Sequence, residues 1–281
     1  MTNNKFYSFI FILALGTFLF SERGSFSVGN IKYDYNNVEF SFSERDVSMK
    51  FDIGKVQFST SNTGFEFVDD GPYESVSMKI GPSKVLLQNI DYEVTFRDYY
   101  NDYSTNNAKF NLGTFRFDLN EFDLDYSDNG PGDIPQINSL NTKLTTNNIV
   151  LDLSGVVFDR YTEERLRQLG NIDRELRLNR ATISANYSSN QLKFSVDGMT
   201  SLGNIKINVI ASINEYNPEL SVCQAAMVTI SNLSPEVQNL INLIQMENPG
   251  MILPMVNGSL SFDLKDKINS DLQRGRFPLD F

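Results

Sequence analysis

Hydrophobic and polar residues alternate with a period of two along most of this chain, and the alternation changes phase at glycines. Gly54 is the clearest case, because the apolar positions before it are odd-numbered and those after it are even-numbered. These positions are Val47, Met49, Phe51 and Ile53 on one side, and Val56 and Phe58 on the other. Side chains of an uninterrupted strand point alternately to opposite faces, so a regular strand cannot keep one face apolar across this change.

Five glycines share this pattern, in which an apolar-x-apolar segment precedes the glycine and a similar segment follows it. They are Gly29, Gly54, Gly81, Gly113 and Gly203. We expect each glycine to open a two-residue type II′ hairpin, because that position requires φ > 0 and the residues flanking such a loop share a face. The alternative is a glycine bulge inside a longer strand, which also shifts the phase by one residue.

Both interpretations predict an all-β fold, mainly an antiparallel meander that forms a long curved sheet, an open groove or a sandwich. The strands carry one apolar face and one face of Ser, Asn, Asp and Lys, which is typical of an antiparallel sheet wetted on one side. One or two short helices are expected near 162–169 and 234–246. The second begins at Ser234 and Pro235, a capping residue followed by a proline that suits the first turn.

The chain begins with a segment typical of a secretory signal peptide, at 1–21. One lysine precedes a fully apolar run at 6–20, which polar residues end. No small-x-small pair directly follows the run, so an uncleaved anchor is the alternative. We expect an N-terminal β-meander at 22–135 and a C-terminal β region with helices at 136–281, or else one continuous domain.

Composition excludes several kinds of chemistry. The net charge is −11, histidine is absent, and Cys223 is the only cysteine. An acidic surface repels nucleic acid, and the absence of histidine removes imidazole catalysis and histidine-ligated metals. A single cysteine cannot form an internal disulfide. We therefore predict no enzymatic activity, no catalytic residue, no cofactor and no metal.

Two charged clusters are candidate binding sites. Calcium could bind the acidic run at 118–133, although its spacing does not fit an EF-hand and a solvated acidic face is the preferred interpretation. The arginines at 160–180 could contact lipid phosphate, but acidic residues are interleaved with them, and local ion pairing is preferred.

The function predicted from these features is that of an exported, periplasmic or cell-surface protein of the cell envelope. Its apolar sheet face would bind or shield a lipid, or bind an envelope protein. One-sided meandering sheets resemble, at the level of fold, the β-groove proteins that shield lipids crossing the periplasm. The candidate groove residues are Val47, Met49, Phe51, Ile53, Val56, Phe58, Phe115, Phe117, Ile205 and Ile207.

Two other functions stay open. Phe277, Leu279 and Phe281 alternate up to the C-terminus, which resembles the closing strand of outer-membrane β-barrels, although Pro278 is awkward in such a strand. A structural or adhesive surface protein without a ligand is the other alternative. No transmembrane helix is expected once the leader is removed.

Overall fold

The structure is a computed structural model, and it describes residues 23–70, 73–98, 104–128, 136–168, 174–214, 217–247, 253 and 255–274. The predicted leader at 1–21 and the alternating C-terminal residues at 276–281 lie outside these ranges.

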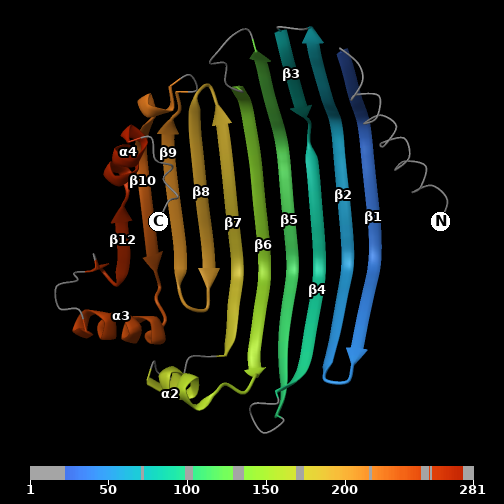
Figure 1. The fold of residues 1–281 in the computed structure, drawn as a ribbon. Coiled ribbons are helices and arrows are strands. Elements are labelled where there is room, and N and C mark those ends of the chain that lie inside the picture. Colours follow the sequence, from blue (N-terminus) through green and yellow to red (C-terminus); the bar gives the residue numbers. More distant parts are fainter. Residues whose placement is uncertain are drawn as a thin grey trace.

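Strands make up most of the described chain (Figure 1). In the N-terminal half they are β1 (Arg23–Glu44), β2 (Val47–Asp70), β3 (Tyr73–Ile80), β4 (Ser83–Asp98), β5 (Ser104–Asp128) and β6 (Gln136–Gly155). In the C-terminal half they are β7 (Glu175–Ser188), β8 (Gln191–Thr200), β9 (Asn204–Ser212), β10 (Val222–Ser231), β11 (Met255–Val256) and β12 (Ser259–Asp263).

Within the described ranges, three short α-helices and one 3-10 turn accompany the strands. They are α2 (Arg160–Gln168), η1 (Pro218–Leu220), α3 (Pro235–Glu247) and α4 (Lys265–Gln273). The helices expected near 162–169 and 234–246 are present as α2 and α3. Helix α4 was not predicted, because its sequence is largely polar, with Ile268 and Leu272 as its apolar residues.

All twelve strands join one antiparallel sheet, in the order β1-β2-β3-β5-β6-β7-β8-β9-β10-β12-β11. Strand β4 lies in line with β3, and both pair with β2 on one side and β5 on the other. The predicted all-β class with a few short helices is therefore confirmed. Strands β5 and β6 pair with each other across the division expected near residue 135.

The prediction of a hairpin at each glycine is wrong at four of the five positions. Gly29, Gly54 and Gly113 lie inside β1, β2 and β5, and Gly81 connects β3 to β4 without a reversal of direction. Only at Gly203 does the chain turn back, between the antiparallel strands β8 and β9. The alternative of glycine within a longer strand is the correct one, and the reason lies in the neighbouring strands.

An asparagine in the left-handed conformation lies opposite each of the three glycines Gly29, Gly54 and Gly113. Gly54 falls between Asn37 of β1 and Asn89 of β4, whose φ angles are 56° and 53°. Gly113 likewise falls between Asn89 and Asn148, which has φ 55°. Asparagine tolerates this conformation better than most residues.

The register between β1 and β2 is the same on both sides of the kink at Asn37 and Gly54, so neither strand carries an inserted residue. Val38 pairs with Ile53 and Asn36 with Lys55, on either side of the Asn37–Gly54 position. Both strands thus shift phase together. The apolar residues stay on one face even though the parity of their numbers changes.

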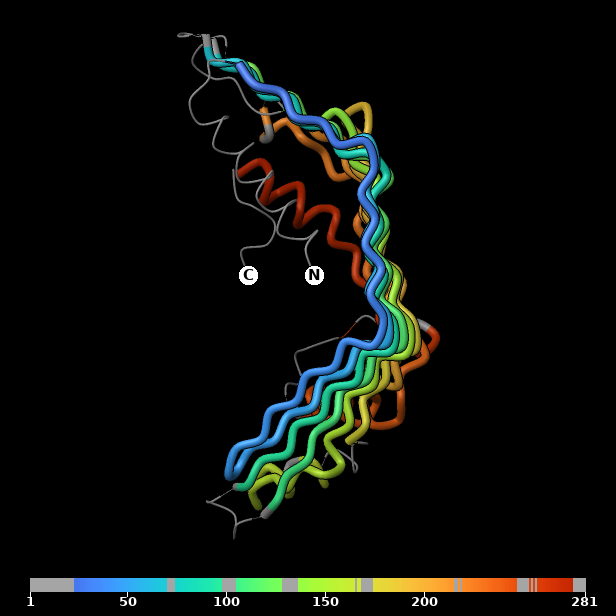
Figure 2. Tube along the Cα trace, turned by 90° about the vertical axis from the view of Figure 1, so that its right-hand side faces the viewer, coloured from blue at the N-terminus to red at the C-terminus, as the bar shows by residue number. Residues whose placement is uncertain are grey.

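A second row of the same kind crosses the first strands of the sheet. Gly29 of β1 lies opposite Asn62 of β2, which has φ 53°, and Gly81 lies on the other side of Asn62. Figure 2 shows the result, a sheet with two bends at which the strands change direction together. The bends make one face of the sheet concave.

The apolar face is the concave one. Helix α4 lies on the concave side and contacts β10 (Figure 2). Beneath it, Cys223 and Ala226 are buried, and by their pairing with Ala211 and Val209 they share a face with the apolar residues of β9. Helices α2 and α3 lie beyond the lower ends of the shorter strands (Figure 1).

Candidate apolar binding face

Six of the ten predicted groove residues fall in two adjacent rows that cross the sheet. Phe58 of β2, Phe117 of β5 and Ile207 of β9 belong to one row. Its members, from β1 to β12, are Tyr33, Phe58, Val85, Phe117, Leu144, Ile183, Val196, Ile207, Val228 and Phe262. Every side chain in this row is apolar or aromatic.

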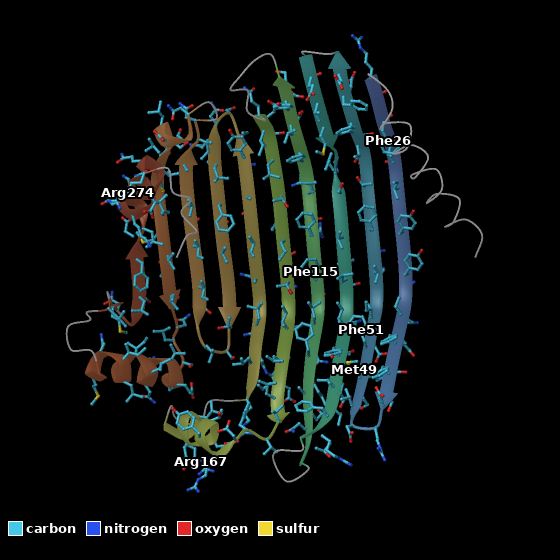
Figure 3. The ribbon with its side chains drawn as sticks, in the orientation of Figure 1. Phe26, Met49, Phe51, Phe115, Arg167 and Arg274 are labelled. Carbon is cyan, nitrogen blue, oxygen red and sulfur yellow. The ribbon has the colours of Figure 1, made fainter. Side chains whose placement is uncertain are left out.

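The adjacent row contains the predicted residues Val56, Phe115 and Ile205. Its members are Tyr35, Val56, Leu87, Phe115, Thr146, Ala181, Gly198, Ile205, Ile230 and Leu260. These positions lie far apart in the sequence, and the sheet brings them into line. Figure 3, which looks onto the concave face, shows Phe115 of β5 near the middle of the sheet.

The other four predicted residues line the lower segment of β2. Phe51 pairs with Phe40 of β1 and Tyr92 of β4, and the Phe51 and Tyr92 rings meet edge to face with centroids 6.3 Å apart. The Tyr92 hydroxyl donates to Met49 Sδ at 3.4 Å. Val47 and Ile53 lie on the same face at either end of this segment (Figure 3 marks Met49 and Phe51 between them).

The β10–β12 end of this face is covered by helices. Leu233, Ile241 of α3 and Leu260 of β12 form a buried cluster, against which Ile230 and Val237 pack. Asn269 of α4 accepts a hydrogen bond from the Cys223 amide at 2.7 Å and donates one to the Cys223 carbonyl at 3.0 Å. Of the predicted residues, Ile205 and Ile207 of β9 lie nearest to this covered end, next to Ile230 and Val228 of β10.

The β1–β5 end of the same face is open among the described residues. The side chain of Phe40 is 60% exposed and that of Tyr35 is 45% exposed. The other large apolar side chains exposed here are Tyr33, Val38, Phe42, Val47 and Phe96. Large apolar patches of this kind on a protein surface mark interaction sites.

Most of these exposed residues were missed by the sequence reasoning. Strand β1, for which the sequence predicts a hairpin at Gly29, contains Tyr33, Tyr35, Val38 and Phe40. The same phase change that identified Val47 to Phe58 also runs through β1, between Tyr35 and Val38, where Asn37 takes the place of a glycine. That signal could have located them.

Near the upper bend, hydroxyl groups of β2 and β4 on the apolar face bond to one another, whereas Thr146 of β6, in the row of Phe115, is buried and its Oγ1 has no partner among the described residues. Thr60 Oγ1 lies 2.6 Å from Ser83 Oγ and 2.9 Å from Thr63 Oγ1. Charged residues of β1 to β5 on this face occur at strand ends, as at Glu44 and Asp69. The middle of the face therefore presents hydrocarbon and aromatic surface.

The charged side chains of these strands lie on the convex face and pair across it. Lys79 binds Asp123 at 3.2 Å, Arg116 binds Asp118 at 2.6 Å, and Asn138 donates to Asp125 at 2.6 Å. Within the described part of the acidic run, Asp118, Asp123 and Asp125 are therefore paired with neighbouring side chains. Within the described ranges, no three acidic or cysteine side chains converge in a way that would hold a metal ion.

The arginine cluster also pairs locally. Arg174 bonds to Glu163, stacks over the Phe158 ring at 5.3 Å, and donates to the Val156 carbonyl at 2.9 Å. Arg160 and Arg177 bind Glu164 and Glu175. These contacts fasten α2 to the sheet and pair Arg160, Arg174 and Arg177 with carboxylates.

Cys223 is fully buried under α4, as a small apolar residue would be. Burial raises the pKa of its thiol. A thiol that is both buried and protonated is a poor nucleophile.

No helix of the described chain combines the length and the apolarity required to cross a membrane. Comparison with known proteins finds no matching family model, no similar curated protein and no similar solved structure.

Proposed function

We propose that this protein is an exported, non-enzymatic envelope protein that binds the acyl chains of lipids on the concave face of β1 to β5. The observation that carries the proposal is the open apolar surface around Phe40, Tyr35 and Tyr33, at the end of the sheet opposite the helices.

The energetics favour an occupant for this surface. When a ligand fully buries a large apolar side chain that was exposed to water, the complex is stabilised by about 1.5–3 kcal/mol. Phe40, Phe42 and Val38 are adjacent on one face of β1, so one elongated ligand could cover all three. The bends of the sheet turn the two ends of the long strands toward the concave side (Figure 2).

The chemistry of the face favours an acyl chain over a protein partner. Protein interfaces combine an apolar centre with a polar rim and a hydrogen bond for roughly each 100–200 Å². Here the hydroxyl groups of Thr60, Thr63 and Ser83 bond to one another, and the charged residues of β1 to β5 lie at strand ends or on the convex face. Flexible hydrocarbon needs no directional partner, so it fits such a surface.

Two matched variants test the proposal. Phe58→Glu places a carboxylate in the middle of the concave face, whereas Ser59→Glu places the same charge on the convex face, opposite Lys32 and Lys84. We expect the full chain to co-purify with lipid detectable by mass spectrometry and to take up a fluorescent fatty acid. Phe58→Glu should weaken that uptake at least tenfold, an effect of about 1.4 kcal/mol, and Ser59→Glu should leave it unchanged.

Circular dichroism of both variants provides the control for folding. The proposal is wrong if the folded wild-type chain carries no lipid and takes up no fatty acid, or if the two variants lose uptake equally.

A further inference from the structure

Strand β1 is one edge of the sheet, and it is 22 residues long. Its inner side pairs with β2 along almost its whole length. From Lys32 to Glu44 every residue of β1 is exposed. A long edge strand offers backbone donors and acceptors to another strand, and such edges pair unless something blocks them.

The strands of this sheet follow a rule that determines which partner fits this edge. On β1, β2 and the β3–β4 segment, an asparagine follows the kink glycine by eight positions, as in Gly29 and Asn37, Gly54 and Asn62, and Gly81 and Asn89. Neighbouring strands are antiparallel, so between β1 and β2, and between β2 and the β3–β4 segment, each of these glycines lies opposite an asparagine and each asparagine opposite a glycine. A strand added beside β1 must therefore carry an asparagine opposite Gly29 and a glycine opposite Asn37.

The contacts between β2 and the β3–β4 strand show why the rule holds. A Cβ on Gly81 would clash with the Ser61 carbonyl oxygen and lie 3.2 Å from the Cβ of Asn62, and a Cβ on Gly54 would lie 3.1 Å from the Cβ of Asn89. Contacts this short leave no room for a larger residue at either glycine. Glycine is therefore required where a neighbouring asparagine approaches.

The outer edge of β1 repeats the edge that β4 presents to β2. Both strands are antiparallel to β2, so they run in the same direction, and Gly29 and Asn37 correspond to Gly81 and Asn89. A Cβ on Gly29 would meet no atom within 4 Å among the described residues. Nothing in the described chain explains why this position is a glycine, whereas a second strand with its own asparagine would.

We propose that two copies of this chain form a two-fold dimer in which their β1 strands pair antiparallel, centred on Tyr33. In this register Gly29 meets Asn37 of the second copy, and Asn37 meets its Gly29, because 29 and 37 are equidistant from 33. A second copy of β1 thus supplies both residues that the edge requires. A two-fold interface of this kind is self-complementary and closed.

The same register keeps the two faces of the sheet matched. On the apolar face it pairs Phe26 with Phe40, Val28 with Val38, and Ile31 with Tyr35, each time across the two copies. These six residues all lie on the concave face within one copy. The apolar surface would continue from one copy into the next without interruption.

Charge on the convex face agrees with this register as well. It places Lys32 of each copy opposite Asp34 of the other, which forms two cross-strand pairs of opposite charge. Within one copy Lys32 lies opposite Ser59, and Asp34 accepts a hydrogen bond from Gln57 at 2.8 Å. Opposite charges directly across an antiparallel pair are favourable, and like charges are not.

Sedimentation of the full chain measures the dimer, and Gly29→Val is the first variant. The space beside Gly29 accepts a larger residue in one copy, so the fold should keep its thermal stability. In the dimer the new side chain would collide with Asn37 of the second copy. The dissociation constant of the dimer should therefore rise at least tenfold. The proposed dimer does not depend on lipid binding. Measuring fatty-acid uptake by the Gly29→Val monomer therefore tests lipid binding separately from dimerisation.

Charge reversal tests the register. Lys32→Glu and Asp34→Lys each place like charges opposite one another, so each variant alone should be monomeric at concentrations where the wild-type chain is a dimer. When the two variants are mixed, opposite charges face one another again and a mixed dimer should form. Tyr33→Cys should give a disulfide-linked dimer on oxidation, whereas Ile31→Cys, four positions out of register with itself, should not.

A wild-type chain that remains monomeric over the accessible concentration range overturns the proposal. A dimer that Gly29→Val leaves unchanged, or in which Ile31→Cys cross-links as fast as Tyr33→Cys, has a different interface and overturns it equally.

Discussion

A Cβ atom added to Gly54 of β2 would lie 3.1 Å from the Cβ of Asn89 on β4. The asparagine has φ 53°, and the glycine beside it leaves room for this conformation. Repeated across the sheet, this relationship bends long strands without breaking their hydrogen-bonded ladders. It also holds the apolar side chains on the concave face.

Gly54→Val should destabilise the fold. Its side chain would be forced against Asn89 and the Gln88 carbonyl, and overpacking of this kind costs about 1–3 kcal/mol. Chemical denaturation of the two variants checks the expectation, with Gly29→Val as the matched control because that site is open. Equal stability of the two variants would contradict the steric role of Gly54.

Asn89 is expected to be replaceable by glycine but not by alanine. Alanine lacks the local hydrogen bonding that lets asparagine adopt a left-handed conformation, and that conformation costs an L-residue about 1–2 kcal/mol. Asn89→Ala should therefore lower the free energy of unfolding by about that amount, while Asn89→Gly should change it little. A loss that is the same for both variants would show that the side chain, rather than the backbone angle, is what matters.

Asn269 is expected to hold α4 on the sheet. Its side chain satisfies both the amide and the carbonyl of Cys223, and removing it leaves these buried groups unpaired, at a cost of about 1–3 kcal/mol. Asn269→Ala should lower the melting temperature, with Ser270→Ala, the next residue of α4, as the control. No change in melting temperature would mean that α4 is held by other contacts.

Cys223 should resist thiol reagents in the folded protein. Burial raises the pKa of its thiol, so the reactive thiolate is scarce at neutral pH and stays scarce until the pH exceeds that raised value. Alkylation at neutral pH should be at least tenfold slower than in the chain unfolded by denaturant. Asn269→Ala should speed it up, whereas rapid alkylation of the wild-type protein would contradict the burial.

The N-terminus of α2 should respond to acid. Asp159 accepts hydrogen bonds from the Thr162 hydroxyl at 2.6 Å and the Thr162 amide at 3.0 Å, and these lower the pKa of the Asp159 carboxyl. A lowered pKa means that the stabilisation is complete at neutral pH and is lost as the pH falls through that lowered value. The Thr162 amide signal in NMR should titrate with a midpoint below the ordinary aspartate value of about 3.9, and Asp159→Asn should abolish the titration.

The sequence alone determined the fold class and which residues would share a surface. Alternation of apolar and polar residues with a period of two requires strands. For Phe51 and Phe58 to face the same side despite the phase change at Gly54, the regular strand must be interrupted between them. The capping residues Ser234 and Pro235 located α3 in the same way. Each of these signals is local, so a single stretch of chain contains all of the information.

Only the tertiary structure decided whether a glycine turns the chain back or bends it. The choice at Gly54 depends on Asn37 and Asn89, which lie on other strands and are adjacent to it only once the sheet has formed. The asparagines eight positions after Gly29, Gly54 and Gly81 were visible in the sequence, but their meaning required the antiparallel register. Which end of the apolar face α3 and α4 cover was likewise decided by packing between distant segments, because no local pattern specifies it.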